Sequence, residues 1–345
     1  MSLLRVVKAF LKAHPAICLL LLTPGIPEYL SGSSPINAII LNPAQFVFQL
    51  TANLGLYGPG VLLIREARIR WNRGLATVFL LGAAYGILEE GIALSTLFDP
   101  EAGPVGVLGT YGHWVGVNWI WVASILPVHM IFSIALPILL LGLALPETRG
   151  RSFLPGRKLW IALLVLGIDV ASLLVIVVKV THFWMGWPIF LASWATIGML
   201  ILAARRAPSN ALAARSELPR LGKMKVGFIG AVFYPSVLLT EFIPAAIGIP
   251  AVADFAVVIL LQGAFLVGIL KVVGRVSNER VVLSLALGLI VPIAAFGVIS
   301  ERALPMTLIA DGVMMLFFRK LWQDHPVKGG VESEVDRRKT QISTL

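Results

Sequence analysis

Apolar stretches of about 20 residues recur along the whole chain, and short polar segments rich in Lys and Arg separate them. A helix of about 20 apolar residues is long enough to cross the hydrocarbon core of a bilayer, which is roughly 30 Å thick. The pattern therefore predicts an all-α fold, a polytopic bundle of transmembrane helices. We predict ten spans, over residues 13–31, 37–64, 75–97, 117–145, 159–180, 184–204, 225–247, 251–271, 281–299 and 303–320.

The basic residues provide an independent test of this count. If the N-terminus is cytoplasmic, all of the 28 Lys and Arg residues fall on the inner side except Lys179 and Arg302. Cytoplasmic segments of membrane proteins carry such an excess of basic residues. The distribution therefore predicts an even number of spans with both termini in the cytoplasm, and a multi-pass protein of the plasma (inner) membrane.

Composition agrees with this class and excludes others. The chain has 345 residues, of which 58% are hydrophobic and 13% charged, so it is not a soluble globular protein. The net charge of +10 is spread in short clusters between apolar runs, which predicts contact with membrane lipids and no nucleic-acid partner. Cys18 is the single cysteine, which rules out a disulfide framework within the chain and a cysteine-based metal site.

The two ends differ from the central part. Basic residues followed by the apolar run 16–22 resemble a signal peptide, but no small-x-small cleavage site follows, so we predict a retained first span. We assign residues 1–323 to the transmembrane domain. The polar segment 324–345 is predicted to be a disordered cytoplasmic tail.

Two spans contain helix breakers. In the second, Gly58, Pro59 and Gly60 predict a break in mid-membrane, which is tolerated only where protein or a wet cavity satisfies the freed backbone groups. The fourth, with Pro127 and Pro137, would be about 43 Å long as a straight helix, so either the prolines kink it or its start lies in the membrane interface. The outer loop 98–116, rich in Gly, either caps a cavity or simply connects two spans.

Glu89 and Glu90 are the most costly residues in the chain because they lie side by side in the third span. Each charged group at that depth costs roughly 2.5–3.5 kcal/mol on insertion scales. Gly82 and Gly86 share a face with Glu90 and would let a neighbouring helix approach closely, so Glu90 should face protein. Adjacent helical residues point about 100° apart, so both carboxylates cannot line one face equally. The pair suits general-base chemistry or proton relay; the alternative is a hydrogen-bonded pair that holds helices together.

His129 in the fourth span is the second candidate. At about 1.5 Å per residue, His129 and the two glutamates lie at similar depth in antiparallel neighbours. The histidine could donate to an oxyanion, join the acids in holding a metal, or relay protons; the alternative is a histidine bonded to a carbonyl freed by Pro127. We assign no metal ligand and leave the cofactor open. Weaker candidates are Asn53, Tyr85 and Asn118 as substrate-binding or cavity-lining residues, and the single acids Asp169, Glu241 and Asp311.

The segment Ala83-Ala84-Tyr85-Gly86-Ile87-Leu88-Glu89-Glu90, followed one span later by His129, resembles the CAAX-protease and bacteriocin-processing (CPBP) intramembrane endopeptidase family. The resemblance implies that Glu89 or Glu90 activates water, that His129 stabilises the oxyanion, and that the substrate is a membrane-embedded peptide. Leu94 stands where that family has Arg, and Ile125 where it has Phe. The chain also resembles uncharacterised prokaryotic multi-pass membrane proteins with a Tyr-Gly-x-x-Glu-Glu-Gly core.

Three hypotheses follow for the function. The first is a glutamate-type intramembrane endopeptidase with Glu89, Glu90 and His129 as catalytic residues. The second is a proton-coupled secondary transporter that uses the two glutamates as an intramembrane proton or ion site, since ten spans divide into two five-span halves of inverted orientation. The third is a non-catalytic membrane protein in which the glutamates are fully enclosed by hydrogen-bond donors.

Overall fold

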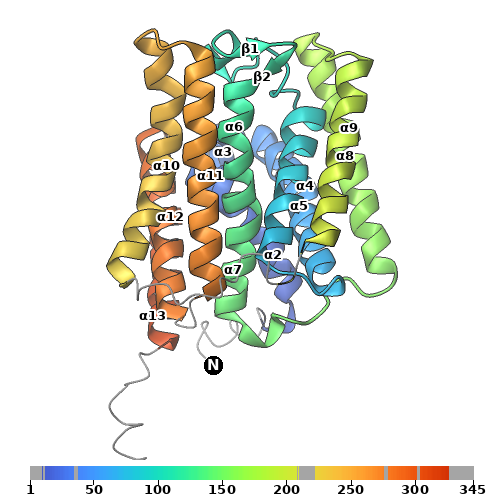
Figure 1. The fold of residues 1–345 in the computed structure, drawn as a ribbon. Coiled ribbons are helices and arrows are strands. Elements are labelled where there is room, and N and C mark those ends of the chain that lie inside the picture. The colour runs from blue at the N-terminus through green and yellow to red at the C-terminus, as the bar shows by residue number, and fades with distance from the viewer. Residues whose placement is uncertain are drawn as a thin grey trace, which may run out of the picture.

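The computed structural model is an all-α bundle, as predicted (Figure 1), and describes residues 10, 12–34, 38–207, 209, 222–275, 279–300 and 304–325. Eight of its helices are long and apolar enough to cross a membrane. The other two predicted spans correspond to a shorter apolar helix, Pro15–Leu30, and to Leu304–Asp324, so the count of ten remains a prediction. The long helices are α4 (Pro43–Arg70), α5 (Leu75–Gly86) with η2 (Ile87–Ala93), α6 (Trp119–Val128) with η4 (His129–Ala135) and α7 (Leu136–Ala144), α8 (Arg157–Thr181), α9 (Trp187–Arg206), α10 (Lys223–Ala246), α11 (Ala251–Arg275), α12 (Glu279–Ser300) and α13 (Leu304–Asp324).

The helices form two groups on either side of a central pair. Helices α8 and α9 lie on one side, α10, α11 and α12 on the other, and α5 and α6 lie between them (Figure 1). The first helix, α2 (Pro15–Pro24) with η1 (Gly25–Leu30), packs on α4, and the short α3 (Ala38–Leu41) follows it. A hairpin of β1 (His113–Trp114) and β2 (Val117–Asn118) covers one end of the bundle, opposite the end of α13. Two short 3₁₀ segments, η3 (Gly106–Gly109) and η5 (Pro146–Thr148), lie in the connections.

Three membrane-depth helices contain a π-helical segment, in which each N–H bonds to a carbonyl five residues earlier. These segments are η1, η2 and η4. The last begins two residues after Pro127 and ends two residues before Pro137, so the hydrogen bonding of the fourth run is irregular between its prolines, and the kink itself remains a prediction. The sequence pattern did not predict η1 or η2.

The break predicted at Pro59 is wrong, because α4 continues as one helix from Pro43 to Arg70. Its glycines serve close packing instead. A Cβ on Gly58 would lie 2.7 Å from Leu20 Cγ, and one on Gly60 would lie 2.4 Å from the Tyr85 ring. Neighbouring helices therefore enclose the region around Pro59, and this packing stabilises a helix that its sequence alone would weaken.

The connection between η2 and α6 folds over the end of the helices. Asn118 Nδ2 donates to the carbonyl oxygens of Thr96 at 2.8 Å and Asp99 at 3.0 Å, and its Oδ1 lies 2.5 Å from His113 Nδ1. Because Asn118 ties both ends of this connection together, its role is to hold the loop. The expectation that Asn118 lines a substrate site has no support in these contacts.

The predicted tail over 324–345 remains a prediction. Helix α13 ends at Asp324, one residue past the predicted boundary, and residues 326–345 lie outside the part of the chain that the structure describes.

The turn of the β1–β2 hairpin is strained at Val115. In this two-residue turn Val115 has φ 55° and Gly116 has φ 73°, and Val115 is 87% exposed. A β-branched residue in the left-handed region costs roughly 1–2 kcal/mol, whereas Asn and Gly suit this turn. We expect Val115→Asn to stabilise the protein by about 1 kcal/mol in thermal unfolding in detergent. The control, Val107→Asn, changes a half-exposed valine of the same loop and should give no gain; equal gains would contradict the strain argument.

Candidate functional site

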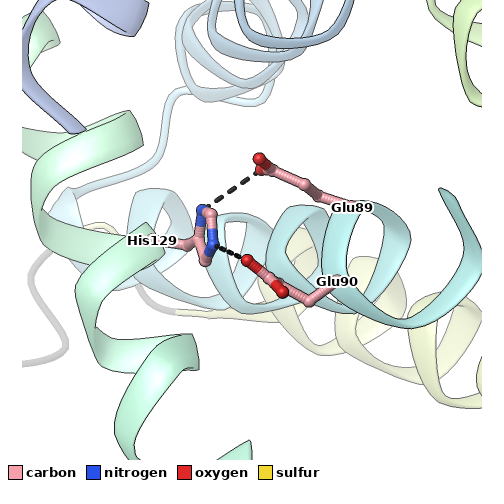
Figure 2. A group of neighbouring side chains, drawn as sticks. All are labelled: Glu89, Glu90 and His129. Atoms are coloured by element: carbon pink, nitrogen blue, oxygen red, sulfur yellow. Dashed lines mark hydrogen bonds and ion pairs between the residues drawn. The ribbon is translucent and has the colours of Figure 1, made fainter. Parts of the chain in front are cut away.

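Glu89, Glu90 and His129 form one buried cluster between η2 and η4 (Figure 2). Glu89 Oε2 lies 3.1 Å from His129 Nδ1, and Glu90 Oε1 lies 2.9 Å from His129 Nε2. The three residues are 2%, 7% and 3% exposed, respectively. The depth match predicted from the sequence is confirmed. Each of the two acids therefore contacts a different nitrogen of the same imidazole ring.

Small residues on α5 bring the two helices together. A Cβ on Gly82 would lie 3.0 Å from Met130 Cα, and one on Gly86 would lie 3.3 Å from His129 Cβ and 2.8 Å from a Leu126 methyl. The prediction that this glycine face lets a neighbouring helix approach is confirmed. The acids follow Gly86 within the π-helical turn, so they reach the histidine at the point of closest approach.

Glu90 is held on both of its oxygens. Oε1 faces His129 Nε2, and Oε2 accepts a hydrogen bond from the hydroxyl of Thr96. Trp121 Nε1 donates to the same hydroxyl at 3.2 Å. Thr96 and Trp121 therefore fix the Glu90 carboxylate, and that carboxylate in turn fixes the orientation of the imidazole.

Glu89 is much less constrained. Its Oε2 is buried and has no well-directed hydrogen bond from the described residues, although His129 Nδ1 lies nearby. That nitrogen is also 3.0 Å from Ser133 Oγ. A buried carboxylate oxygen normally accepts a hydrogen bond. Glu89 is therefore less fully bonded than Glu90, with His129 Nδ1 at 3.1 Å and Tyr85 as its neighbours.

A second acidic cluster, which sequence reasoning missed, lies next to the first. Tyr57 donates to Glu28 Oε1 at 2.6 Å, Ser34 donates to Glu28 Oε2 at 2.7 Å, and Asn53 donates to Ser34 at 3.0 Å. The Tyr57 ring stacks on the His129 ring with centroids 6.4 Å apart. Glu28 lies close to the end of the predicted first span, where inserting an acid into the membrane costs little free energy. Its position beside Tyr57 and His129 depends on tertiary packing, which the sequence does not show.

The remaining predicted residues fall into different places. Tyr85 packs against His129, with ring centroids 6.2 Å apart, and also lines an apolar cavity. Asn53 belongs to the Glu28 cluster. Asp169 of α8 contacts α4 at Gly55, where a Cβ would lie 2.7 Å from its Oδ1. The structure brings neither Glu241 of α10 nor Asp311 of α13 into the Glu89–Glu90–His129 group.

The donor set of the site would also suit a metal ion. One ligand atom from each of Glu89, Glu90 and His129 lies within 4.8 Å of the other two, and all three residues are buried. Imidazole nitrogen with carboxylate oxygens is a ligand set that Zn²⁺ and other first-row divalent ions accept. The geometry is therefore compatible with either acid–base chemistry or metal binding.

Comparisons with known proteins identify a family for the chain. The matching family model is described as an uncharacterized membrane protein family, and it covers residues 17–214. That segment contains both acidic clusters and helices α2 to α9. No curated protein and no solved structure matches the chain, and the resemblance to CPBP endopeptidases has no support from these comparisons. Because the match covers more than half of its length, the chain belongs to this uncharacterized family of membrane proteins.

Proposed function

We propose that this protein is an intramembrane endopeptidase in which Glu89 activates water and His129 stabilises the oxyanion. The observation that carries the proposal is the difference between the two glutamates. Glu90 has both oxygens engaged, whereas Glu89 has a buried oxygen without a well-directed donor beside the imidazole. A general base needs an oxygen that can take a proton, and Glu89 Oε2, whose 3.1 Å contact with His129 Nδ1 is not well directed, meets this need better than either oxygen of Glu90.

The roles follow from the contacts. Glu89 would accept a proton from a water whose oxygen attacks the scissile peptide carbonyl. His129, placed between two carboxylates, would donate an N–H to the oxygen on which negative charge develops. The C–N bond then breaks, and the proton on Glu89 passes to the leaving amine. Glu90 is a positioning residue in this scheme because it acts through the histidine.

The local helix geometry favours a functional role over simple helix pairing. Each of the three π-helical segments carries an ionisable group of the two clusters: η1 has Glu28, η2 has Glu89 and Glu90, and η4 has His129. Single π-helical turns occur frequently at functional sites. A purely structural pair would also be expected to have every buried oxygen satisfied, which is not so for Glu89 among the described residues.

A panel of peptides that carry single transmembrane segments tests the proposal. Purified protein in lipid nanodiscs is incubated with the panel, and products are identified by mass spectrometry. Cleavage that depends on Glu89 and His129 supports the endopeptidase. Cleavage that persists unchanged in Glu89→Gln would disprove the assigned chemistry.

Proton-coupled transport is the second candidate, and the Glu28 cluster is the observation that favours it. Glu28, Tyr57 and His129 lie side by side, so a proton could pass between two separate acidic groups. If the protein conducts protons, proteoliposomes with an imposed pH gradient should take up protons, and Glu28→Gln should slow uptake at least tenfold by removing one relay group. Glu241→Gln, a buried acid outside the clusters, is the matched control. Uptake no faster than in empty vesicles would exclude this candidate.

A further inference from the structure

An apolar cavity of about 680 Å³ lies between α4, α5 with η2, α8 and α9. Its volume is within the range of roughly 300–1,000 Å³ that is typical of sites for small ligands. Aliphatic side chains line most of it, among them Leu63, Leu88, Leu166 and Ile197. Because no other described element fills the space, the cavity is available to an apolar ligand.

In the topology that the basic residues predict, the end of α4 at Arg70 lies on the cytoplasmic side, so the cavity runs from that side toward the middle of the bundle. Along α4 its wall runs from Gly60 to Trp71, a distance of about 16 Å at the α-helical rise. Glu66, Arg70 and Trp71 stand at the cytoplasmic end, and Tyr85 stands at the inner end. An occupant would therefore be apolar along most of its length and polar at one end.

Glu66 adds little negative charge to the cytoplasmic end because its carboxylate is already engaged. Arg70 Nε lies 2.7 Å from one oxygen, which also accepts from Ser152 at 2.6 Å. The backbone N–H groups of Phe153 and Leu154 donate to the other oxygen at 3.0 and 3.3 Å. The carboxylate is thus compensated by its own partners and does not offset the other cations nearby.

Basic residues lie at the chain segments and helix ends that flank this end of the cavity. Leu159, which lines it, follows directly on the start of α8, and Ile201 lies one turn before the end of α9. Arg73 Nε is buried without a hydrogen-bond partner among the described residues. Basic pockets between helices on the cytoplasmic side bind anionic head groups. Arg70 is already paired with Glu66, so the basic rim comprises the other basic residues of this group, Arg73, Arg157, Lys158, Arg205 and Arg206.

We propose that this cavity binds a phosphate-bearing anionic lipid of the cytoplasmic leaflet, with a hydrocarbon chain among the aliphatic residues and the head group at the basic rim. The site adjoins the Glu89–Glu90–His129 cluster through Tyr85, but lipid binding there does not depend on the proposed peptidase chemistry. A peptide in extended form would leave its backbone N–H and C=O groups unsatisfied against the aliphatic walls, whereas a hydrocarbon chain has none. The cluster of positive charge selects an anionic head group.

Quenching of tryptophan fluorescence by brominated acyl chains tests the site. Trp71 and Trp194 line the cavity. The fluorescence of Trp194 is obtained by subtracting the emission of the Trp194→Phe variant from that of the wild-type protein. Protein in phosphatidylcholine nanodiscs receives increasing amounts of brominated phosphatidylglycerol or, separately, brominated phosphatidylcholine. We expect half-maximal quenching of Trp194 at a mole fraction of phosphatidylglycerol at least about fivefold lower than that of phosphatidylcholine. Equal quenching by the two lipids would overturn the proposal.

A cavity-filling substitution with a matched control locates the binding. Gly167 lines the cavity, and a Cβ there meets no atom within 4 Å, so Gly167→Phe fills the space without a backbone clash. Gly198 on α9 is equally open but does not line the cavity. Gly167→Phe should abolish the preference for phosphatidylglycerol and Gly198→Phe should keep it. If Gly167→Phe reduces expression or thermal stability, the smaller Gly167→Leu takes its place.

The rim is tested in the same assay. Replacing Arg157 and Arg205 together by Gln should weaken the preference for phosphatidylglycerol over phosphatidylcholine by about fivefold or more. Each basic residue near a membrane surface contributes roughly that factor to the binding of an anionic lipid. An unchanged preference in this variant, or in the cavity-filling variant, would show that the lipid binds elsewhere. Loss of peptide cleavage in Gly167→Phe with equal quenching by both lipids would instead identify the cavity as a peptide route and overturn the lipid proposal.

Discussion

Glu89→Gln is expected to lower kcat for peptide cleavage by about 10³-fold, within the usual contribution of a general base. The amide has nearly the shape of the carboxylate but cannot take a proton from water. The substitution keeps the size of the side chain and removes the negative charge that faces His129 Nδ1 at 3.1 Å. The fall should therefore appear in kcat with KM nearly unchanged, measured on the best peptide of the panel.

Glu90→Gln is the informative comparison, because the two residues are adjacent, have the same side chain and are similarly buried. A glutamine can still accept from His129 Nε2, so the imidazole keeps its orientation in part, and we expect a loss of roughly 10- to 100-fold. Thr96→Val removes the other constraint on Glu90 and should give a similar loss. The double variant Glu90→Gln/Thr96→Val should lose little more than either change alone, since both act through one positioned group.

Glu241→Gln on α10 is the control for a buried acid outside the site, and its rate should stay within about twofold of wild type. The opposite order, with Glu90→Gln inactive and Glu89→Gln active, would exchange the two roles. Activity in both variants would remove the glutamate-based mechanism altogether.

Much of the helical arrangement could be predicted because it depends on local properties. Helix rise is constant, so counting residues along two antiparallel spans placed His129 beside Glu89 and Glu90, and the structure confirms this with distances of 3.1 and 2.9 Å. The role of Gly82 and Gly86 followed from side-chain size alone. Such inferences need no knowledge of which other helices surround the pair.

Other features depend on tertiary packing and could not be predicted. Pro59 normally disrupts a helix, yet Leu20 and Tyr85 pack so closely on the glycines beside it that α4 continues. The π-helical turns change the hydrogen-bond pattern of only a few residues, and no pattern in the sequence identifies them. Glu28 joins the site through Tyr57, a contact 29 residues away in sequence.

The difference from the CPBP pattern has a structural counterpart. Leu94, at the position where that family has Arg, ends η2 and packs against the hydrophobic core. His129 is then the one potentially cationic side chain that contacts Glu89 and Glu90 among the described residues. The imidazole must therefore do more in this protein than donate one hydrogen bond, because it also separates the charges of two adjacent carboxylates.

Removal of that imidazole should produce the largest loss of stability of any single change at the site. His129→Leu keeps a side chain of similar size but leaves Glu89 and Glu90 buried without their shared partner. Breaking a buried pair by removing one member costs roughly 3–5 kcal/mol, because the remaining charge is uncompensated. We expect a loss of this size in the free energy of unfolding, measured by reversible titration of mixed micelles with SDS.

The same measurement separates lost charge compensation from lost packing. In the triple variant His129→Leu/Glu89→Gln/Glu90→Gln both acids are replaced by neutral amides, so most of the loss should be recovered if it arises from the carboxylates. Ser133→Ala, which removes only the neutral hydroxyl 3.0 Å from His129 Nδ1, should cost about 1 kcal/mol or less. A triple variant no more stable than His129→Leu would mean that the ring stabilises the protein through its contacts with Tyr57 and Tyr85. The contacts of the ring with the two glutamates would then contribute little to stability. Two buried acids in a membrane-spanning helix, which are costly to insert, would in that case serve the reaction and not the fold.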